Sequence, residues 1–289
     1  MSWRTVVITE RCKLDLSMGY MVVRGEETVR ILIDEMAMLM IEDPAVSMTG
    51  CLLSELADKK VRVIFCDAKR SPYAELQPYN GSYDCSKKIR QQTEWTEEQK
   101  QLVWTAIVSE KICNQAKVLI EYGHEKEAAM LTGYMSEMCP GDSSNREGHA
   151  AKVYFNALFG KSFSRGQENT TNTALNYGYG LLLSAFNREV TMNGFLTHIG
   201  LCHNNMFNPY NLSCDLMEPF RALVDRCVID MKPTEFGKSE KQSLLAVLHS
   251  HVYIAGTEQT VLNAVKIYAR SVFESVGGGS PEKINFIEI

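Results

Sequence analysis

The sequence lacks any long hydrophobic run. Its longest apolar stretches, at residues 36–41 and 181–186, are far shorter than the roughly 20 residues that a helix needs to cross a bilayer. Residues 1–5 also lack the basic-then-apolar order that opens a secretory signal. We therefore expect a soluble protein that stays in the cytoplasm and binds no membrane.

The chain contains no Cys-x-x-Cys motif, and its nine cysteines are an odd number. The cysteines that lie among apolar neighbours are Cys51, Cys66, Cys113 and Cys227. In such surroundings a free cysteine acts as a small hydrophobic residue. Cys202, His203 and Cys214 would leave a tetrahedral zinc site one ligand short. We therefore predict reduced thiols, as in a reducing compartment.

Three common catalytic signatures are also missing: a Walker loop, a glycine-rich dinucleotide turn and a Ser-His-Asp arrangement. The net charge of −5 argues against a protein that coats nucleic acid by bulk charge, but it allows a local basic surface. Two basic clusters are candidates for DNA contact: Lys87, Lys88 and Arg90 in one, and Arg146, Lys152, Lys161 and Arg165 in the other. Either cluster could equally be a solvated charged face.

The pattern of residues changes near residue 96. Before it, β-branched and aromatic runs predict strands at residues 5–9, 20–24, 29–33, 36–41 and 61–67, with one helix at 49–60. After it, the spacing predicts helices at residues 97–123, 144–159, 172–193, 211–231 and 258–275.

These patterns predict an α+β fold with a small N-terminal β domain and a larger C-terminal all-α domain. The β domain would span residues 1–85 and the helical domain residues 99–276. Residues 86–98 would be a charged linker between them. Residues 277–289, which begin with glycines and end in alternating apolar residues, would form a flexible tail that either frays or docks on a neighbour as a strand.

Glu147 lies in the segment Ser144-Asn-Arg-Glu147-Gly-His-Ala-Ala, which has two interpretations. A serine followed three residues later by a glutamate is a capping box at a helix start. However, the helical face of Glu147 continues with the small or apolar residues Ala150, Ala151 and Tyr154. A carboxylate at the head of such a buried stripe is costly unless something compensates it. This motif alone supports capping and catalysis equally.

His203 lies in Gly200-Leu-Cys-His203-Asn-Asn, a polar and irregular segment that follows a long predicted helix. Loops held by rigid helices often carry functional residues. A lone histidine is nevertheless more often a core or surface residue than a ligand, so this segment only suggests a site.

Asp215-Leu-Met-Glu218-Pro-Phe-Arg221 is the third segment of interest. Because Asp215 and Glu218 are three residues apart, both could project from one helical face. Pro219 either lies in the first turn of a helix, with Glu218 as a favourable N-terminal acid, or distorts a helix so that the carboxylate points into a cleft. Arg221 could contact a phosphate or pair with Asp215.

Two glutamates and a histidine, namely Glu147, His203 and Glu218, make a recognisable set of metal ligands. Magnesium prefers oxygen ligands, and manganese also accepts imidazole. Such an ion can polarise a phosphoryl oxygen and stabilise the attacking or the leaving oxygen of a displacement. The set is therefore compatible with metal-assisted phosphoryl transfer.

At these three segments the chain resembles a known family, the CRISPR-associated integrase that is the first of the Cas proteins. The resemblance is to the form that accompanies a single-protein RNA-guided nuclease. Residues 144–151, 200–203 and 211–221 match the three signature segments in order and spacing. Trp104-Thr-Ala-Ile and Tyr177-Gly-Tyr179 also match, and weaker similarity covers essentially the whole chain.

The resemblance implies that the N-terminal β domain mediates dimerisation and that the helical domain is catalytic. It assigns Glu147, His203 and Glu218 as ligands of Mg²⁺ or Mn²⁺. Asp215, Arg146 and Arg221 would support the site. Many family members carry aspartate at the third ligand position, so the longer Glu218 would alter metal distance or preference.

The implied reaction is a transesterification in the acquisition of new spacers. The 3′-hydroxyl of a short captured DNA attacks a phosphodiester at the boundary of a CRISPR repeat. The implied partners are double-stranded DNA, a second copy of the chain, and the small second Cas protein, which bridges two integrase dimers.

Two alternatives remain open at the level of the sequence. A metal-dependent DNA endonuclease would use the same ligands, with water as the attacking group. A non-catalytic DNA-binding scaffold would use Glu147 only as a cap and Glu218 only to favour a helix start.

Overall fold

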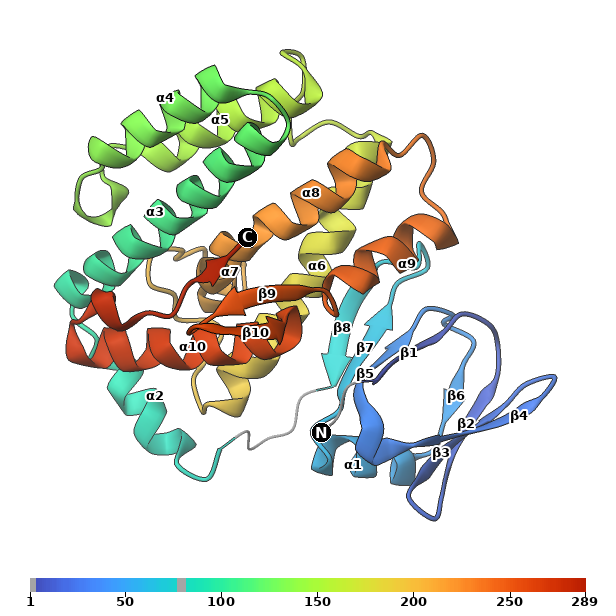
Figure 1. Cartoon of the computed structure of the whole chain (residues 1–289). Helices are drawn as coiled ribbons and strands as arrows, with labels where there is room; N and C mark the ends of the chain where they lie inside the picture. The colour runs from blue at the N-terminus through green and yellow to red at the C-terminus, as the bar shows by residue number, and fades with distance from the viewer. Residues whose placement is uncertain (1–3, 77–81) are drawn as a thin grey trace. The chain divides into compact units, whose positions relative to one another are not determined.

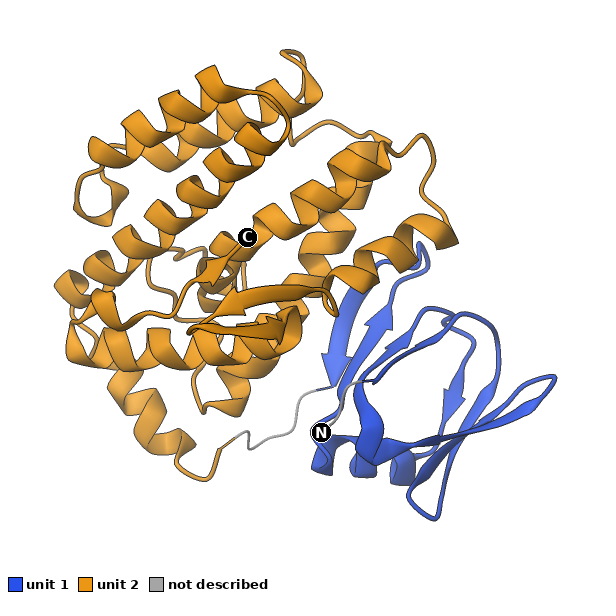
Figure 2. Ribbon diagram, viewed as in Figure 1, with its two compact units in different colours: residues 1–81 blue, residues 82–289 orange. Residues whose placement is uncertain are grey.

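The computed structural model describes residues 4–76 and 82–289. The chain forms two compact units, residues 1–81 and residues 82–289 (Figures 1 and 2). The first unit holds two four-stranded sheets, and the second is mainly helical. The predicted α+β class is confirmed.

The first sheet of unit 1 contains the most buried strand of the chain. Its order is β1-β5-β7-β8, with β1 (Arg4–Ile8), β5 (Met36–Ile41) and β7 (Arg62–Cys66) parallel and β8 (Pro72–Leu76) antiparallel to β7. The central strand β5 reads Met-Ala-Met-Leu-Met-Ile without alternation, and most of it is buried. A continuous apolar run of this kind is typical of a parallel strand that is covered on both faces.

The second sheet of unit 1 has the order β4-β3-β2-β6. The strands β2 (Lys13–Ser17), β3 (Tyr20–Arg24) and β4 (Thr28–Leu32) form an antiparallel meander, and β6 (Ser47–Met48) pairs in parallel with β2. A short turn, η1 (Ile33–Glu35), leads from β4 into β5. The helix α1 (Gly50–Asp58) buries Leu52 and Leu56 in the same apolar cluster as Leu14 and Ile33, which closes the core of this unit.

The second unit is built around one long helix, α3. Its elements are α2 (Cys85–Thr93), α3 (Glu97–Glu121), α4 (Glu125–Ser136), η2 (Pro140–Asp142), α5 (Arg146–Phe159), α6 (Thr170–Met192), α7 (Asn211–Met217), η3 (Glu218–Phe220), α8 (Arg221–Met231), α9 (Lys238–Val247), α10 (Val261–Gly278) and η4 (Pro281–Lys283). α3 starts at a reciprocal capping box between Thr96 and Gln99. It packs against α4 and α5 along one side and against η3, α8 and α10 elsewhere (Figure 1).

The prediction of an all-α second domain is incomplete, and the prediction of a flexible tail is wrong. Unit 2 contains a small antiparallel sheet of β10 (Thr257–Thr260), β9 (His251–Ile254) and β11 (Ile287–Glu288). The tail adds the strand β11 to β9, and Ile284 and Ile287 are buried. The alternating apolar residues of the tail therefore fold onto the chain's own helical unit.

The prediction of a linker at residues 86–98 is also wrong, because most of this segment is helical. Residues 85–93 form α2, and α3 begins at Glu97. Gln92 of α2 is buried: its amide nitrogen donates to the carbonyl oxygens of Leu196 and Ile199, and its amide oxygen accepts from the Leu196 N–H. The many charged residues of α2 suggested a linker, and no local pattern in the sequence indicated that Gln92 is buried.

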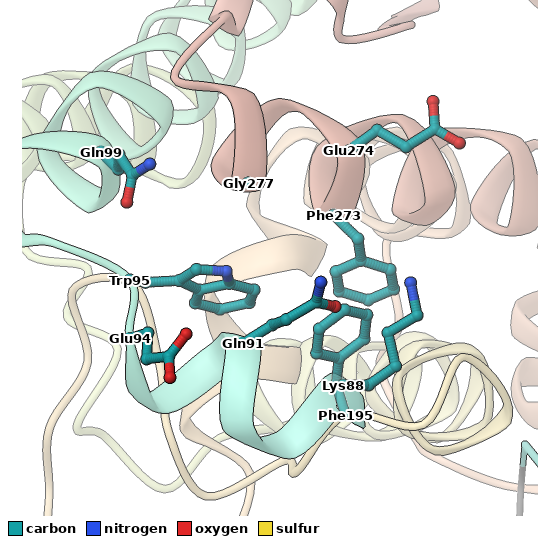
Figure 3. Close-up of a pocket in the computed structure, with 9 residues that line it drawn as sticks. All are labelled: Lys88, Gln91, Glu94, Trp95, Gln99, Phe195, Phe273, Glu274 and Gly277. Carbon is teal, nitrogen blue, oxygen red and sulfur yellow. The ribbon is translucent and has the colours of Figure 1, made fainter. Parts of the chain in front are cut away.

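α2 and α10 line a cavity of about 480 Å³ (Figure 3). Its lining residues are Lys88, Gln91, Glu94, Trp95, Gln99, Phe195, Phe273, Glu274 and Gly277. The Phe195 ring packs between two other aromatic rings: its centroid lies 5.5 Å from that of Trp95 and 4.4 Å from that of Phe273. The cavity wall is therefore part of the packing that attaches α2 to the unit.

The described helices include none that is long and apolar enough to cross a membrane.

Candidate functional site

Glu147 is placed by the first turn of α5, and its side chain is not a cap. The N–H groups of Arg146 and Glu147 donate to Asp142 Oδ1 and Oδ2, at 2.7 and 2.9 Å. Asn145 precedes the helix in the left-handed conformation, with φ of 54°. The capping-box interpretation of Ser144 and Glu147 is therefore wrong, because Asp142 takes that role. The Glu147 carboxylate is free to face other elements.

Glu218 lies where a proline interrupts two helices. α7 ends at Met217, the turn η3 carries Glu218 and Pro219, and α8 starts at Arg221. The Asn114 side-chain amide on α3 donates to the Pro219 carbonyl oxygen at 3.1 Å, in the buried interior. A proline lacks the N–H of a regular helix, which interrupts the helical ladder here, and the Asn114 side chain binds the buried carbonyl of the same residue. The structure combines features of both interpretations, because the helical path is interrupted here while Glu218 and Pro219 lie in the first turn of η3.

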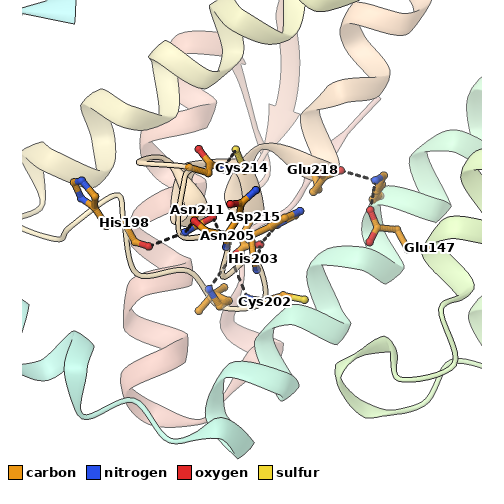
Figure 4. A network of polar contacts seen from close by, with 12 residues as sticks. Glu147, His198, Cys202, His203, Asn205, Asn211, Cys214, Asp215 and Glu218 are labelled. Carbon is orange, nitrogen blue, oxygen red and sulfur yellow. Dashed lines mark hydrogen bonds and ion pairs between the residues drawn. The ribbon is translucent and has the colours of Figure 1, made fainter. Parts of the chain in front are cut away.

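The two glutamates meet at Lys111 of α3. Lys111 Nζ lies 2.5 Å from Glu147 Oε1 and 2.5 Å from Glu218 Oε2 (Figure 4). Burial alone would lower the pKa of Lys111, but Glu218 and Glu147 outweigh it and raise the pKa above its usual value. Burial alone would raise the pKa of Glu218, but Arg221 and Lys111 outweigh it and lower the pKa to about 2. Both groups are therefore charged at neutral pH.

Arg221 pairs with Glu218, whereas the sequence had suggested Asp215 as one possible partner. Its Nε and Nη2 atoms lie 3.0 and 2.9 Å from Glu218 Oε1. The guanidinium also lies over the Tyr179 ring, 4.6 Å from its centroid. This stacking fixes the plane of the guanidinium and holds its charge beside the glutamate.

His203 is oriented by Asp215, which is fully buried at the end of α7. His203 Nδ1 lies 2.5 Å from Asp215 Oδ1. The same carboxylate accepts three backbone hydrogen bonds, from the N–H groups of Leu201, Cys202 and His203. The hydrogen bond to Asp215 raises the pKa of His203 above its usual value. With Nδ1 held in this way, Nε2 is the ring nitrogen that can bind a metal.

Gly200 makes this loop possible. A Cβ atom at this position would lie 2.4 Å from the His203 carbonyl oxygen and 2.6 Å from Asp215 Oδ2. Both distances are far below van der Waals contact. The loop can therefore wrap the Asp215 carboxylate only if residue 200 has no side chain.

α3 forms the common wall of the site. The Trp104 ring contacts the His203 ring edge-on, with centroids 5.8 Å apart. Lys111, two helical turns later, reaches both glutamates, and Asn114 reaches the backbone beside Glu218. α3 therefore contacts each of the three predicted ligands, Glu147 and Glu218 through Lys111 and His203 through Trp104.

By the chemistry of their donor atoms Glu147, Glu218 and His203 suit a divalent ion, but they do not converge on one point, and Lys111 lies between the two glutamates. Glu218 Oε2 is buried, and the Lys111 ammonium lies 2.5 Å from it. Two carboxylates and an imidazole oriented by a carboxylate are suitable ligands for Mn²⁺ and Mg²⁺. In residues 4–76 and 82–289, no three His, Cys, Asp or Glu side chains converge at metal-binding distance. Lys111 occupies the position between the two glutamates.

Arg146, predicted to support the site, points elsewhere. Its Nη2 atom lies 3.0 Å from Glu137 Oε2, and its guanidinium lies over the Tyr134 ring of α4. It is adjacent to Glu147 in sequence, but the described contacts tie it to α4 and not to the two glutamates.

The predicted DNA-contacting residues divide into exposed and anchored ones. Lys87, Arg90, Lys152 and Lys161 are exposed. Lys88 lies over the Phe195 ring, 5.6 Å from its centroid. Arg165 is held between Asn172, Asn176 and the Tyr179 ring, which makes it a structural residue as well as a basic one.

Sequence reasoning missed Lys111, Asn114 and Asp142. A signal existed for the first two, because Lys111 and Asn114 stand on the same helical face as the apolar Val108 and Trp104. A charged residue on a burying face requires a partner. Asp142 gave no such signal, since its role as a cap depends on the left-handed backbone of Asn145.

The chain was compared with known families and proteins. A family model described as "CRISPR associated protein Cas1" matches residues 5–247. The CRISPR-associated endonuclease Cas1 of Neisseria meningitidis is 33% identical over 295 residues, which cover 100% of this chain and 97% of that protein.

Two solved structures share the fold. A casposase bound to integration product has a TM-score of 0.79 at 15% identity, covering 96% of this chain and 91% of that one. A chain of a Cas6-RT-Cas1–Cas2 complex has a TM-score of 0.76 at 16% identity, covering 98% of this chain and 36% of that one.

Proposed function

The chain belongs to the family of CRISPR-associated protein Cas1, and from this premise we propose that it is a metal-dependent DNA integrase of spacer acquisition. In this proposal Glu147, His203 and Glu218 hold Mg²⁺ or Mn²⁺. The 3′-hydroxyl of a short captured DNA attacks the phosphorus of a phosphodiester at a CRISPR repeat boundary, so that a new P–O bond forms while the existing P–O bond to the 3′-oxygen of that strand breaks and leaves a 3′-hydroxyl. The single observation that carries the proposal is the meeting of two acidic side chains, from α5 and η3, at one buried cation.

Each ligand has a support that acts before any metal binds. Asp142 caps α5 and leaves Glu147 free, Arg221 fixes one oxygen of Glu218, and Asp215 fixes the His203 ring. When bound, the ion would polarise a phosphoryl oxygen and stabilise the attacking or leaving oxygen. The side chains themselves orient these groups and keep water from the buried oxygens of Glu218, which contributes preorganisation.

The proposed partners are double-stranded DNA, a second copy of the chain and the small second Cas protein. Support comes from the fold shared with a casposase whose structure contains an integration product, and with a chain of a Cas6-RT-Cas1–Cas2 complex. A composite surface of this kind explains how a chain with a net charge of −5 would act on DNA. Dimerisation through the N-terminal unit is part of the same proposal.

A second candidate function is hydrolysis of DNA by the same ligands. This candidate is favoured by the similarity to the Neisseria meningitidis relative, which is named as an endonuclease. The two reactions differ only in the attacking group, a DNA hydroxyl or a water molecule, so their products distinguish them.

Strand transfer tests the proposal. The protein and its small partner are mixed with a short duplex bearing 3′-hydroxyls and with a supercoiled plasmid carrying a leader and repeat. Mn²⁺ or Mg²⁺ is either supplied or chelated. Branched or relaxed plasmid joined to the duplex is expected only with metal. Cleavage without joining supports the endonuclease, and binding without any product contradicts both enzymatic functions.

Two variants accompany this assay. Glu147→Gln is expected to lower product formation at least roughly 100-fold, because a lost ligand costs at least as much as a lost outer partner of a ligand. Glu125→Gln is the matched control, since Glu125 is also an acid in the first turn of its helix, α4, but is exposed. Equal losses in the two variants would contradict the assigned role of Glu147.

A further inference from the structure

Lys111 is buried between two carboxylates that belong to different elements. Its side chain is 9% exposed, and its ammonium contacts Glu147 of α5 and Glu218 of η3 at the same distance, 2.5 Å. Two oxygens at that distance from one nitrogen lie at most about 5 Å apart. Two oxygen ligands of a magnesium ion, each about 2.1 Å from it, lie up to about 4 Å apart. The lysine therefore holds the carboxylates near the spacing that a metal requires.

The charge balance explains why a lysine is present at this position. Glu218 is buried, and a buried carboxylate without a compensating charge is strongly destabilising. Arg221 contacts Oε1 of Glu218, and Lys111 contacts the buried Oε2. Glu147, on a different helix, has the same neighbour. One ammonium thus links α3, α5 and η3 through their acidic side chains.

We infer that Lys111 is the resident cation of the metal-free site and that it competes with the divalent ion for Glu147 and Glu218. It is a positioning residue: it keeps the two carboxylates together while the protein folds, and the metal takes over their oxygens. The inference rests on the proposed metal site. A structural ion pair of the ordinary kind would affect folding alone, whereas a competing cation also weakens metal binding.

The test uses Lys111→Met, which keeps the unbranched side chain up to its fourth atom and removes the charged end. Thermal melting is recorded in chelator and in Mn²⁺, and the Kd for Mn²⁺ is measured by calorimetry. Lys111→Met is expected to melt several degrees lower in chelator, to gain more from Mn²⁺ than the wild type, and to bind Mn²⁺ at least about tenfold more tightly.

Lys100→Met is the matched control. Lys100 lies on the same helix, is partly buried, and pairs with Glu97, away from the site. It is expected to leave the Mn²⁺ affinity and the Mn²⁺-dependent rise in melting temperature unchanged. If Lys111→Met binds Mn²⁺ no more tightly than Lys100→Met does, the inference about Lys111 is wrong. If the wild type itself binds no Mn²⁺, the proposed metal site fails, and the inference fails with it.

A double variant covers the case in which Lys111→Met does not fold in chelator. Lys111→Met/Glu147→Gln removes one positive and one negative charge together, and leaves Glu218 with Arg221. This variant is expected to fold in chelator and to melt above the single variant, because fewer buried charges lack a partner. A double variant that is no more stable than Lys111→Met would overturn the claim that Lys111 serves these carboxylates.

Discussion

Replacing Asp215 with asparagine removes the negative charge and one of the two acceptor oxygens, while the shape of the side chain is kept. Asp215 accepts at both oxygens: Oδ2 from the N–H groups of Leu201 and Cys202, at 2.6 and 3.1 Å, and Oδ1 from the N–H of His203 at 3.1 Å, with His203 Nδ1 2.5 Å away. Asparagine has one side-chain oxygen, so it can keep either the two contacts at Oδ1 or the two at Oδ2, but not both sets. Its NH₂ group would face donors that it cannot satisfy.

The cost follows from these contacts. Hydrogen bonds to a charged group contribute about 1.5–3 kcal/mol each, so losing two costs about 3–6 kcal/mol. Asp215 is fully buried, and water cannot replace the lost acceptor. The asparagine variant is therefore expected to lose about 3 kcal/mol or more of unfolding free energy. A loss of that size is a large fraction of the stability of an ordinary domain.

Urea unfolding followed by circular dichroism measures this loss, and Mn²⁺ calorimetry measures its effect on the site. Metal affinity is expected to fall about 10–100-fold, because the His203 ring loses the partner that orients it. Asp230→Asn is a suitable control, since Asp230 is an exposed aspartate that accepts from the Tyr122 hydroxyl. A loss below 1 kcal/mol for Asp215→Asn would refute the view that this carboxylate organises the His203 loop.

Three further outcomes are expected. Gly200→Ala should lower the melting temperature and disturb His203, because its Cβ would lie 2.4 Å from the His203 carbonyl oxygen. Gly133→Ala on α4 is the control: its Cβ meets no atom within 4 Å, so its melting temperature should be unchanged or higher. Asn114→Ala should cost about 1–3 kcal/mol in urea unfolding, because the buried Pro219 carbonyl loses its donor. Burial raises the pKa of Asp225 to about 6 in spite of hydrogen bonds from Tyr179 and Tyr154, so the folded state binds this proton more tightly than the unfolded state. Stability should then fall by up to about 3 kcal/mol as the pH rises from 4 to 6, and Asp225→Asn should remove that part of the pH dependence; an unchanged slope would contradict it.

Periodicity and turn signals predicted most elements of the chain. The strands β3 and β5 were predicted with the bounds that the structure has, and the long helix α3 was predicted at residues 97–123 against Glu97–Glu121. These elements are decided locally, by β-branched runs, helical spacing and a capping box. Glu147 was also identified in advance from the conflict between its charge and its apolar face, and Glu218 from its spacing to Asp215 and its position before Pro219.

The errors come from non-local contacts. α2 was assigned as a linker because its surface is charged, but Gln92 anchors it to backbone more than 100 residues later in the chain. The C-terminal tail pairs with β9, and no local pattern identifies which strand a short segment will join. Lys111 was overlooked for the same reason, since its two partners lie 36 and 107 residues later in the chain.

The charges around the site connect the fold to the proposed chemistry. Glu147, Glu218 and Asp215 outnumber Lys111 and Arg221 by one negative charge. A divalent ion turns this excess into one net positive charge as long as Lys111 stays nearby, and into a neutral site if Lys111 moves away. Only the metal-bound site would then attract a DNA phosphate, since the metal-free site repels it. A chain with an acidic net charge can therefore act on DNA where metal, ligands and substrate come together.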